Sequence, residues 1–202
     1  MIFNKDKKEK KMKIDLKQNS WAWFKHRKNY VNASEIGTIM GLNPYETVEE
    51  LIKKKLFGNN FVTNEAVEHG KKTEPQAHLF FSVFTKRNYE PAVFVQEPFS
   101  ASLDGYHEAS QTMLEIKCPL KKESPAWKDF WEKQIIPPYY WAQIQCGLYC
   151  SDTSKAYFLV YFNSQDYIVK EVSLNEEFIK KMVVKGQSYL HQLNQYKDLL
   201  KA

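Results

Sequence analysis

The sequence predicts an α/β or α+β domain in which one β-sheet packs against helices. The chain has 202 residues, of which 43% are hydrophobic and 26% are charged, a composition typical of a globular domain. Apolar residues recur at helical spacing in the first and last thirds, whereas β-branched and aromatic runs occupy the middle. The resulting order is helices, three strands, a helix, two strands and a last helix, which favours a central sheet flanked by helices.

Helix signals open the chain. Asn19 and Ser20 can cap a helix that begins at Trp21, and Asn32 or Ser34 can cap a second short helix that continues through residue 40. Further helices are predicted at residues 47–56 and 65–85. The longer of these has apolar residues at i, i+3, i+4 and i+7, which are Ala77, Phe80, Phe81 and Phe84.

In the middle of the chain, the spacing of apolar residues changes from that of helices to that of strands. Strands are predicted at residues 94–96, 99–106 and 112–118, and the last two form a hairpin through residues 107–111. Residues 119–138 contain four prolines and are expected to hold short helical stretches at most. A helix at 139–149, strands at 157–162 and 167–172, and a helix at 176–200 complete the pattern.

The positive charge is concentrated at the start of the chain. Residues 1–18 contain seven lysines and three acids, a net charge of +4, so that the other 184 residues carry about +1 of the total of +5. We therefore expect a flexible lysine-rich head at 1–18 and a single domain at 19–202. The longest apolar run has seven residues, against the about 20 that a bilayer helix needs, so no membrane span is expected.

The three cysteines are too few for a disulfide framework. Cys146 and Cys150 are four residues apart and would share one face of a helix, but no histidine cluster accompanies them or Cys118. Buried, reduced thiols of a cytoplasmic protein are the better interpretation.

The predicted hairpin contains the residues with the clearest chemistry. Because alternate side chains of a strand share a face, Glu115 and Lys117 point the same way, and Asp104 on the preceding strand can lie beside Glu115. Two neighbouring carboxylates repel each other unless a cation lies between them, and their hard oxygen atoms suit Mg²⁺ or Mn²⁺. The Ile116 carbonyl could supply another ligand, and Lys117 would then lie beside a metal-bound water.

A second interpretation remains open for the hairpin: an edge hairpin whose solvated face carries a Glu–Lys pair. Two further residues favour a site. Glu74 continues the apolar stripe of its helix, and Gln143 falls on the stripe of the helix at 139–149. A polar residue on a core-facing stripe is either hydrogen-bonded structure or part of a site, and together with the hairpin residues a site is preferable.

Six blocks of the chain, in order, resemble the phage-type exonuclease family, which includes lambda exonuclease and the YqaJ-like viral recombinases. This family belongs to the PD-(D/E)XK nuclease superfamily. The resemblance extends from about Trp21 to Phe162 and rests on residues 23–36, 41–45, 70–74, 102–105, 114–119 and 140–145. It implies a restriction-endonuclease-like core, a central mixed β-sheet flanked by α-helices. Leu103 replaces the proline of the superfamily name, and the lysine-rich head has no counterpart in the family pattern.

The resemblance also implies roles for individual residues. Asp104 and Glu115 match the metal-binding acids, Glu74 the helix-borne acid that completes the metal site, Lys117 the catalytic lysine and Gln143 the glutamine of the following helix, with Gln145 a weaker substitute. Arg27 and Ser34 match residues that bind the 5′ phosphate of DNA. Without the resemblance, Arg27 would be interpreted as an exposed surface cation.

The function expected from the resemblance is a Mg²⁺-dependent exonuclease. It would use two ions, accept Mn²⁺ in their place, and degrade duplex DNA from a 5′ end to leave a 3′ single strand for recombination. A ring-shaped homotrimer and a single-strand annealing protein as partner are further implications. Two alternatives remain: an endonuclease on the same scaffold, and a DNA-binding or assembly module whose carboxylates are structural.

Overall fold

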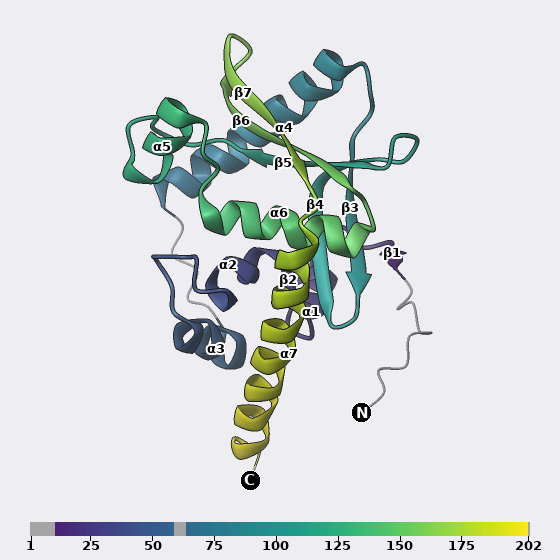
Figure 1. Cartoon of the computed structure of the whole chain (residues 1–202), viewed down its shortest axis with the longest axis vertical. Coiled ribbons are helices and arrows are strands. Elements are labelled where there is room, and N and C mark those ends of the chain that lie inside the picture. Colours follow the sequence, from purple (N-terminus) through teal and green to yellow (C-terminus); the bar gives the residue numbers. More distant parts are fainter. Residues whose placement is uncertain (1–10, 59–63, 202) are drawn as a thin grey trace.

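A mixed β-sheet forms the centre of the computed structural model, which describes residues 11–58 and 64–201 (Figure 1). The strand order is β1-β3-β4-β5-β6-β7, and β2 lies beside β4. Neighbouring strands are antiparallel except β2–β4 and β5–β6, which are parallel. The strands are β1 Met12–Ile14, β2 Val31–Asn32, β3 Glu90–Gln96, β4 Phe99–His107, β5 Thr112–Lys117, β6 Lys155–Asn163 and β7 Asp166–Ser173.

The helices begin where the sequence supplies caps. The side chains of Ser20, Thr47, Asn64 and Asn175 each accept a hydrogen bond from a backbone N–H of the first turn that follows. The described helices are α1 Trp21–Arg27, the 3₁₀ turn η1 Ala33–Glu35, α2 Ile36–Ile39, α3 Val48–Phe57, α4 Glu65–Thr85, α5 Pro125–Lys133, α6 Pro138–Ser151 and α7 Glu176–Leu199. None of them is both long enough and apolar enough to cross a membrane.

Helices cover both faces of the sheet, which confirms the predicted α/β class. In Figure 1, α4 lies behind the sheet and α6 crosses in front of it. Ala77 and Phe81 of α4 pack with Leu114 and Ile116 of β5 in one buried cluster. A larger cluster joins α6 to the opposite face, where Met113 of β5 lies. Glu115 and Lys117 alternate with Leu114 and Ile116, so they point to the face covered by α6.

The structure differs from the sequence prediction at the lysine-rich head. Met12–Ile14 forms β1, which pairs with β3 in antiparallel register, Met12 opposite Val95, so this part of the predicted head belongs to the sheet. Three residues are too few to show a strand period in the sequence. The rest of the predicted head, residues 1–10, lies outside the described residues.

Two other predicted elements differ in length. β3 starts at Glu90, four residues before the prediction, because a shift of register between Glu90 and Ala92 accommodates Pro91 near the start of the strand. The second predicted helix is divided into η1 and α2, with Asn32 at the N-terminal cap of η1. The long helix has the predicted bounds, 65–85.

Candidate active site

The site begins where the β4–β5 hairpin stops pairing through its backbone. The antiparallel ladder ends at Gly105 opposite Leu114. One residue further, the Oδ2 atom of Asp104 accepts a hydrogen bond from the backbone N–H of Ile116 at 2.7 Å. The Asp104 carboxylate is thereby held at the open end of the hairpin, next to Glu115.

Glu115 is the most buried acid of the site, with 2% of its surface exposed. Its Oε1 atom accepts hydrogen bonds from Lys117 Nζ at 2.5 Å and from Gln143 Nε2 of α6 at 2.6 Å. Burial of a carboxylate is unfavourable without such partners. The structure thus brings together Asp104, Glu115, Lys117 and Gln143 from two strands and one helix.

Burial dominates the electrostatics of the acids. It raises the pKa of Glu115 to about 7, because desolvation and the charges of Asp104 and Glu74 outweigh the attraction of Lys117. Burial likewise raises the pKa of Asp104, although the Lys117 ammonium and the Ile116 N–H act in the opposite direction. These carboxyl groups therefore hold protons more tightly than carboxyl groups in water, and a bound cation would favour their ionised form.

Lys117 stays protonated. Burial alone would lower the pKa of its ammonium group, but the charges of Glu115 and Asp104 outweigh that effect and raise it. The Nζ atom also lies 5.0 Å from the centroid of the Tyr140 ring, within the range of a cation–π contact. Lys117 can therefore donate hydrogen bonds and stabilise negative charge, and it is unsuited to accept a proton near neutral pH.

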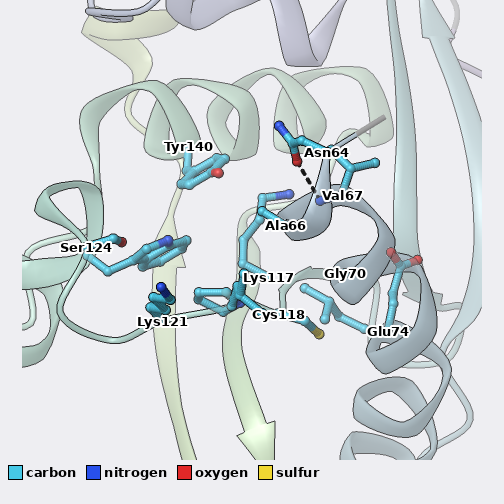
Figure 2. A pocket seen from close by; sticks show the side chains of 14 residues that line it. Asn64, Ala66, Val67, Gly70, Glu74, Lys117, Cys118, Lys121, Ser124 and Tyr140 are labelled. Atoms are coloured by element: carbon cyan, nitrogen blue, oxygen red, sulfur yellow. Dashed lines mark hydrogen bonds between the residues drawn. The ribbon is translucent and has the colours of Figure 1, made fainter. Parts of the chain in front are cut away.

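Glu74 lies in α4, the helix that covers the face of the sheet opposite to α6. More than a third of its surface is exposed, yet desolvation and the charge of Asp104 raise the pKa of its carboxyl group. Glu74 borders a pocket of about 540 Å³. Lys117, Cys118 and Tyr140 also border it, and Figure 2 shows Lys117 extending from β5 between α4 and the Tyr140 ring.

The oxygen atoms of the three acids are suitable ligands for a hard divalent cation. Asp104, Glu115 and Glu74 offer carboxylate oxygens, and Ile116, which follows Glu115 directly in β5, offers its backbone carbonyl. Such a set of oxygen donors is typical of Mg²⁺ and Mn²⁺ sites. Burial, the largest cause of the raised pKa values of Asp104 and Glu115, outweighs the attraction of Lys117 at both acids. Among the described residues, no three His, Cys, Asp or Glu side chains already converge closely enough to hold a metal ion.

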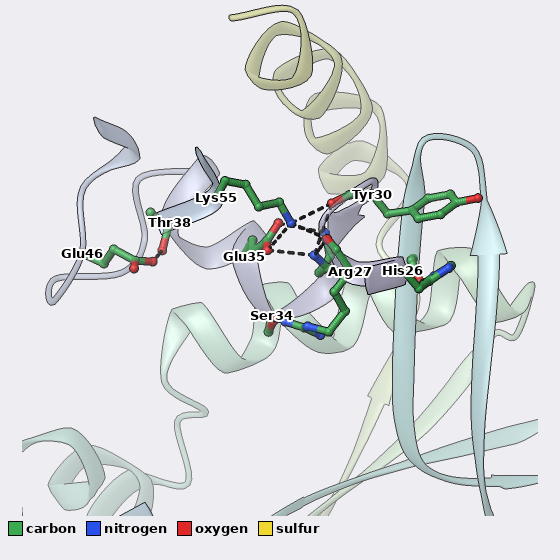
Figure 3. Close-up of polar contacts among 10 residues, drawn as sticks. His26, Arg27, Tyr30, Ser34, Glu35, Thr38, Glu46 and Lys55 are labelled. Atoms are coloured by element: carbon green, nitrogen blue, oxygen red, sulfur yellow. Dashed lines mark hydrogen bonds and ion pairs between the residues drawn. The ribbon is translucent and has the colours of Figure 1, made fainter. Parts of the chain in front are cut away.

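Arg27 and Ser34 meet in a second pocket, of about 350 Å³ (Figure 3). The Nη2 atom of Arg27 donates a hydrogen bond to Ser34 Oγ at 2.8 Å. The guanidinium carbon lies 4.6 Å from the centroid of the Trp23 ring, which supports the side chain from one side. A guanidinium group beside a hydroxyl group is a suitable receptor for a phosphate.

Gln145 does not take part in either pocket. Its side chain is fully buried, and it donates to the Ser173 carbonyl and accepts from the Asn175 N–H. It therefore joins α6 to the turn before α7, and Gln143 is the glutamine that faces the acids.

The structure adds two residues that the sequence did not single out. Tyr140 contacts Lys117 and stacks on Trp127, with 5.4 Å between the ring centroids. His78 lies one helical turn after Glu74, and its charge acts weakly against the burial that raises the pKa of Asp104. In the sequence, the i, i+4 spacing places His78 on the same face of the helix as Glu74, and this spacing could have identified His78. Tyr140 opens the block 140–145 of the family resemblance, but aromatic residues are frequent in this chain and nothing in that block distinguishes its ring as a partner of Lys117.

Comparison with known proteins gives three results. Residues 22–154 match the model of the YqaJ-like viral recombinase domain. An uncharacterised protein of Acanthamoeba polyphaga mimivirus is 28% identical over 159 residues, which cover 70% of this chain and 28% of that protein. The chain thus spans little more than a quarter of the length of this curated relative.

Solved structures share the fold. An alkaline exonuclease from Laribacter hongkongensis superimposes with a TM-score of 0.72 at 22% identity, over 90% of this chain and 96% of that chain. Its complex with dAMP gives a TM-score of 0.73, also at 22% identity and with the same coverage of both chains. A phage-related exonuclease from Haemophilus somnus gives 0.66 at 18% identity, over 85% of this chain and 96% of that chain.

Proposed function

The chain belongs to the YqaJ-like viral recombinase domain family, and on that premise we propose that it is a metal-dependent deoxyribonuclease that degrades duplex DNA from 5′ ends and leaves 3′ single strands. One observation carries the proposal. Glu115, almost fully buried beside Asp104, accepts hydrogen bonds from both Lys117 and Gln143. A buried acid with a raised pKa, paired with a lysine that borders a pocket, is characteristic of a catalytic site.

Asp104, Glu115, Glu74 and the Ile116 carbonyl are the proposed ligands of two Mg²⁺ ions, for which Mn²⁺ can substitute. Bound divalent ions supply Lewis acidity and lower the pKa of water at such a site. The protein supplies the rest. Gln143 fixes the orientation of the Glu115 carboxylate, and the Lys117 ammonium stabilises the negative charge that develops on the attacked phosphate.

Recognition of a DNA end is assigned to the second pocket. Arg27 and Ser34 are proposed to bind the 5′ phosphate, because the guanidinium group offers paired N–H donors and the Ser34 hydroxyl group already lies at 2.8 Å from it. A site that holds the terminal phosphate favours attack near an end over attack within a strand, which distinguishes an exonuclease from an endonuclease on the same scaffold.

The experiment that tests the proposal compares linear, nicked and closed circular DNA in Mg²⁺ and in EDTA. We expect the chain to digest linear duplex DNA in Mg²⁺ only and to leave closed circles intact. Lys117→Ala should slow digestion by about a hundredfold or more, the loss of one charge-stabilising group. Lys180→Ala, an exposed lysine of α7, is the matched control and should keep the parental rate.

Other outcomes would contradict the proposal in distinct ways. Cleavage of closed circles would favour the endonuclease alternative. Binding of DNA without cleavage, and without binding of Mg²⁺, would favour a DNA-binding or assembly module whose carboxylates are structural. Digestion by Lys117→Ala at the parental rate would show that Lys117 has another role.

Assembly and partners are proposed from the family resemblance. We propose a ring-shaped homotrimer that acts in the cytoplasm together with a single-strand annealing protein. Light scattering tests the ring, because a mass of one chain in solution would contradict it.

A further inference from the structure

A buried ion pair, Lys55 with Glu35, borders the same pocket as Arg27 and Ser34, and Figure 3 shows the four side chains. Lys55 of α3 has 7% of its side chain exposed, and its partner Glu35 has 11%. The Lys55 Nζ atom donates to Glu35 Oε1 at 2.7 Å, to the Arg27 carbonyl at 2.6 Å and to the Tyr30 carbonyl at 2.9 Å. All three hydrogen positions of the ammonium group therefore have protein acceptors.

Asn32 closes the same network from the other side. Its Nδ2 atom donates to the Arg27 carbonyl at 2.8 Å and to Glu35 Oε1 at 2.8 Å, and its backbone N–H donates to Glu35 Oε2 at 3.0 Å. The acceptors of Lys55 are thus held in place by a second residue. The segment from Arg27 to Glu35, which contains Ser34, is bound to α3 through one ammonium group.

The position of this network links it to the pocket. Arg27 is the last residue of α1, so the hydrogen bond from Lys55 to its carbonyl fixes the backbone from which the guanidinium group extends. Glu35, the carboxylate partner of Lys55, is the chain neighbour of Ser34. Lys55 does not contribute to the guanidinium–hydroxyl pair itself, but it holds both of the backbone segments that carry the pair.

We propose that Lys55 is the positioning residue of the Arg27–Ser34 pocket and sets the preference of the protein for a 5′-phosphorylated DNA end, an inference that rests on the proposed function. A buried ion pair is a poor device for stability alone, since apolar residues of similar volume often stabilise a protein as well or better. Small displacements of binding groups, in contrast, reduce binding and rate strongly.

The test uses the whole chain and two linear duplexes that differ only in their 5′ ends, one phosphorylated and one with a hydroxyl group. The ratio of their initial digestion rates in Mg²⁺ is measured for each variant. Anisotropy of short labelled duplexes with the same two ends, in EDTA, reports binding without catalysis. Lys55→Met removes the ammonium group at similar length. Lys53→Met, on an exposed position of the same helix, removes the same charge and is the control.

We expect Lys55→Met to lower the phosphate-to-hydroxyl ratio about tenfold in rate and in binding, and to change the rate on the hydroxyl end less than twofold. Lys53→Met should keep the parental ratio. Lys55→Arg keeps the charge and enough donors for the three acceptors, so it should restore the ratio to within about threefold of the parent.

A second variant distinguishes a loss of positioning by Lys55 from a loss of folding. Lys55→Met leaves Glu35 buried without its partner, whereas Lys55→Met combined with Glu35→Gln removes both charges. The double variant should regain thermal stability while its ratio stays low. If it regains the parental ratio as well, Lys55 serves stability only and the inference is overturned.

Failure of the inference and failure of the proposed function give different results. If Arg27→Ala loses the preference for phosphate and Lys55→Met keeps it, the pocket stands and the role of Lys55 is wrong. If the parent shows no preference in either assay, the pocket itself is wrong and the inference falls with it.

Discussion

Replacement of Glu115 by glutamine tests the electrostatic account of the site without any substrate. Glutamine has nearly the same shape as glutamate and can still accept hydrogen bonds from Lys117 and Gln143, but it does not titrate. The parent and the Glu115→Gln variant should therefore differ in how their stability depends on pH.

The magnitude follows from the pKa of Glu115, which the fold raises from 4.5 to about 7. Between these values the native state binds a proton that the unfolded chain releases, so the stability of the parent falls as the pH rises through this window. At 1.36 kcal/mol for each pKa unit, the loss amounts to about 3 kcal/mol, with no reduction for solvent screening because Glu115 is 2% exposed. The raised pKa of Lys117 acts only above pH 10.5, outside the window.

The assay is urea denaturation of both proteins at pH 5 and at pH 8 in EDTA. The free energy of unfolding of the parent, relative to that of Glu115→Gln, should fall by about 3 kcal/mol between the two pH values, or by roughly 10 °C in Tm. Groups that titrate equally in both proteins cancel in the comparison. A relative stability that is the same at pH 5 and pH 8 would refute the claim that burial raises the pKa of Glu115.

Three further predictions concern neighbouring features. Addition of Mg²⁺ should raise the Tm of the parent more at pH 8 than at pH 6, because the ligand carboxylates must lose their protons, and scanning calorimetry measures the difference. Gly37→Ala should lower the free energy of unfolding by about 1–3 kcal/mol, because the new Cβ atom would lie 2.6 Å from Tyr139 Cβ. Gly70→Ala should raise the free energy of unfolding by about 0.5–1 kcal/mol, because its Cβ atom would meet no atom within 4 Å and alanine favours a helix. Urea denaturation measures both changes. Tyr140→Leu should slow single-turnover digestion about 2- to 30-fold through the lost contact with Lys117, and Tyr140→Phe, which keeps the ring, should not.

Local sequence patterns predict the helices and strands whose apolar residues recur at a regular spacing. The stripe through Ala77 and Phe81 identifies α4 as a helix that packs on the core, and the alternation of β5 places Glu115 and Lys117 on one face and Leu114 and Ile116 on the other. A sheet flanked by helices follows from the order of such elements, whereas its mixed strand directions are implied by the family resemblance. These features depend on residues that are near one another in the chain.

Features that depend on distant contacts could not be predicted in this way. β1 and β2 are two or three residues long and exist because β3 and β4 offer free edges in the right register. The ion pair of Lys55 joins residues 20 apart in the sequence, and one lysine of the run Lys53-Lys54-Lys55 gives no sign that it is the buried one. The raised pKa of Glu115 likewise depends on α6, which covers the acid from 28 residues away.

Helix α6 contacts the segments that carry both pockets. Tyr140 and Gln143 contact Lys117 and Glu115, whereas Tyr139 packs so closely on Gly37, three residues after Ser34, that a methyl group there would overlap it. A single helix of 14 residues therefore sets the spacing between the Arg27–Ser34 pocket, the proposed receptor for a terminal phosphate, and the acids proposed to bind the metal ions. Under the proposed function, that spacing would fix how far from the terminal phosphate the strand is cut.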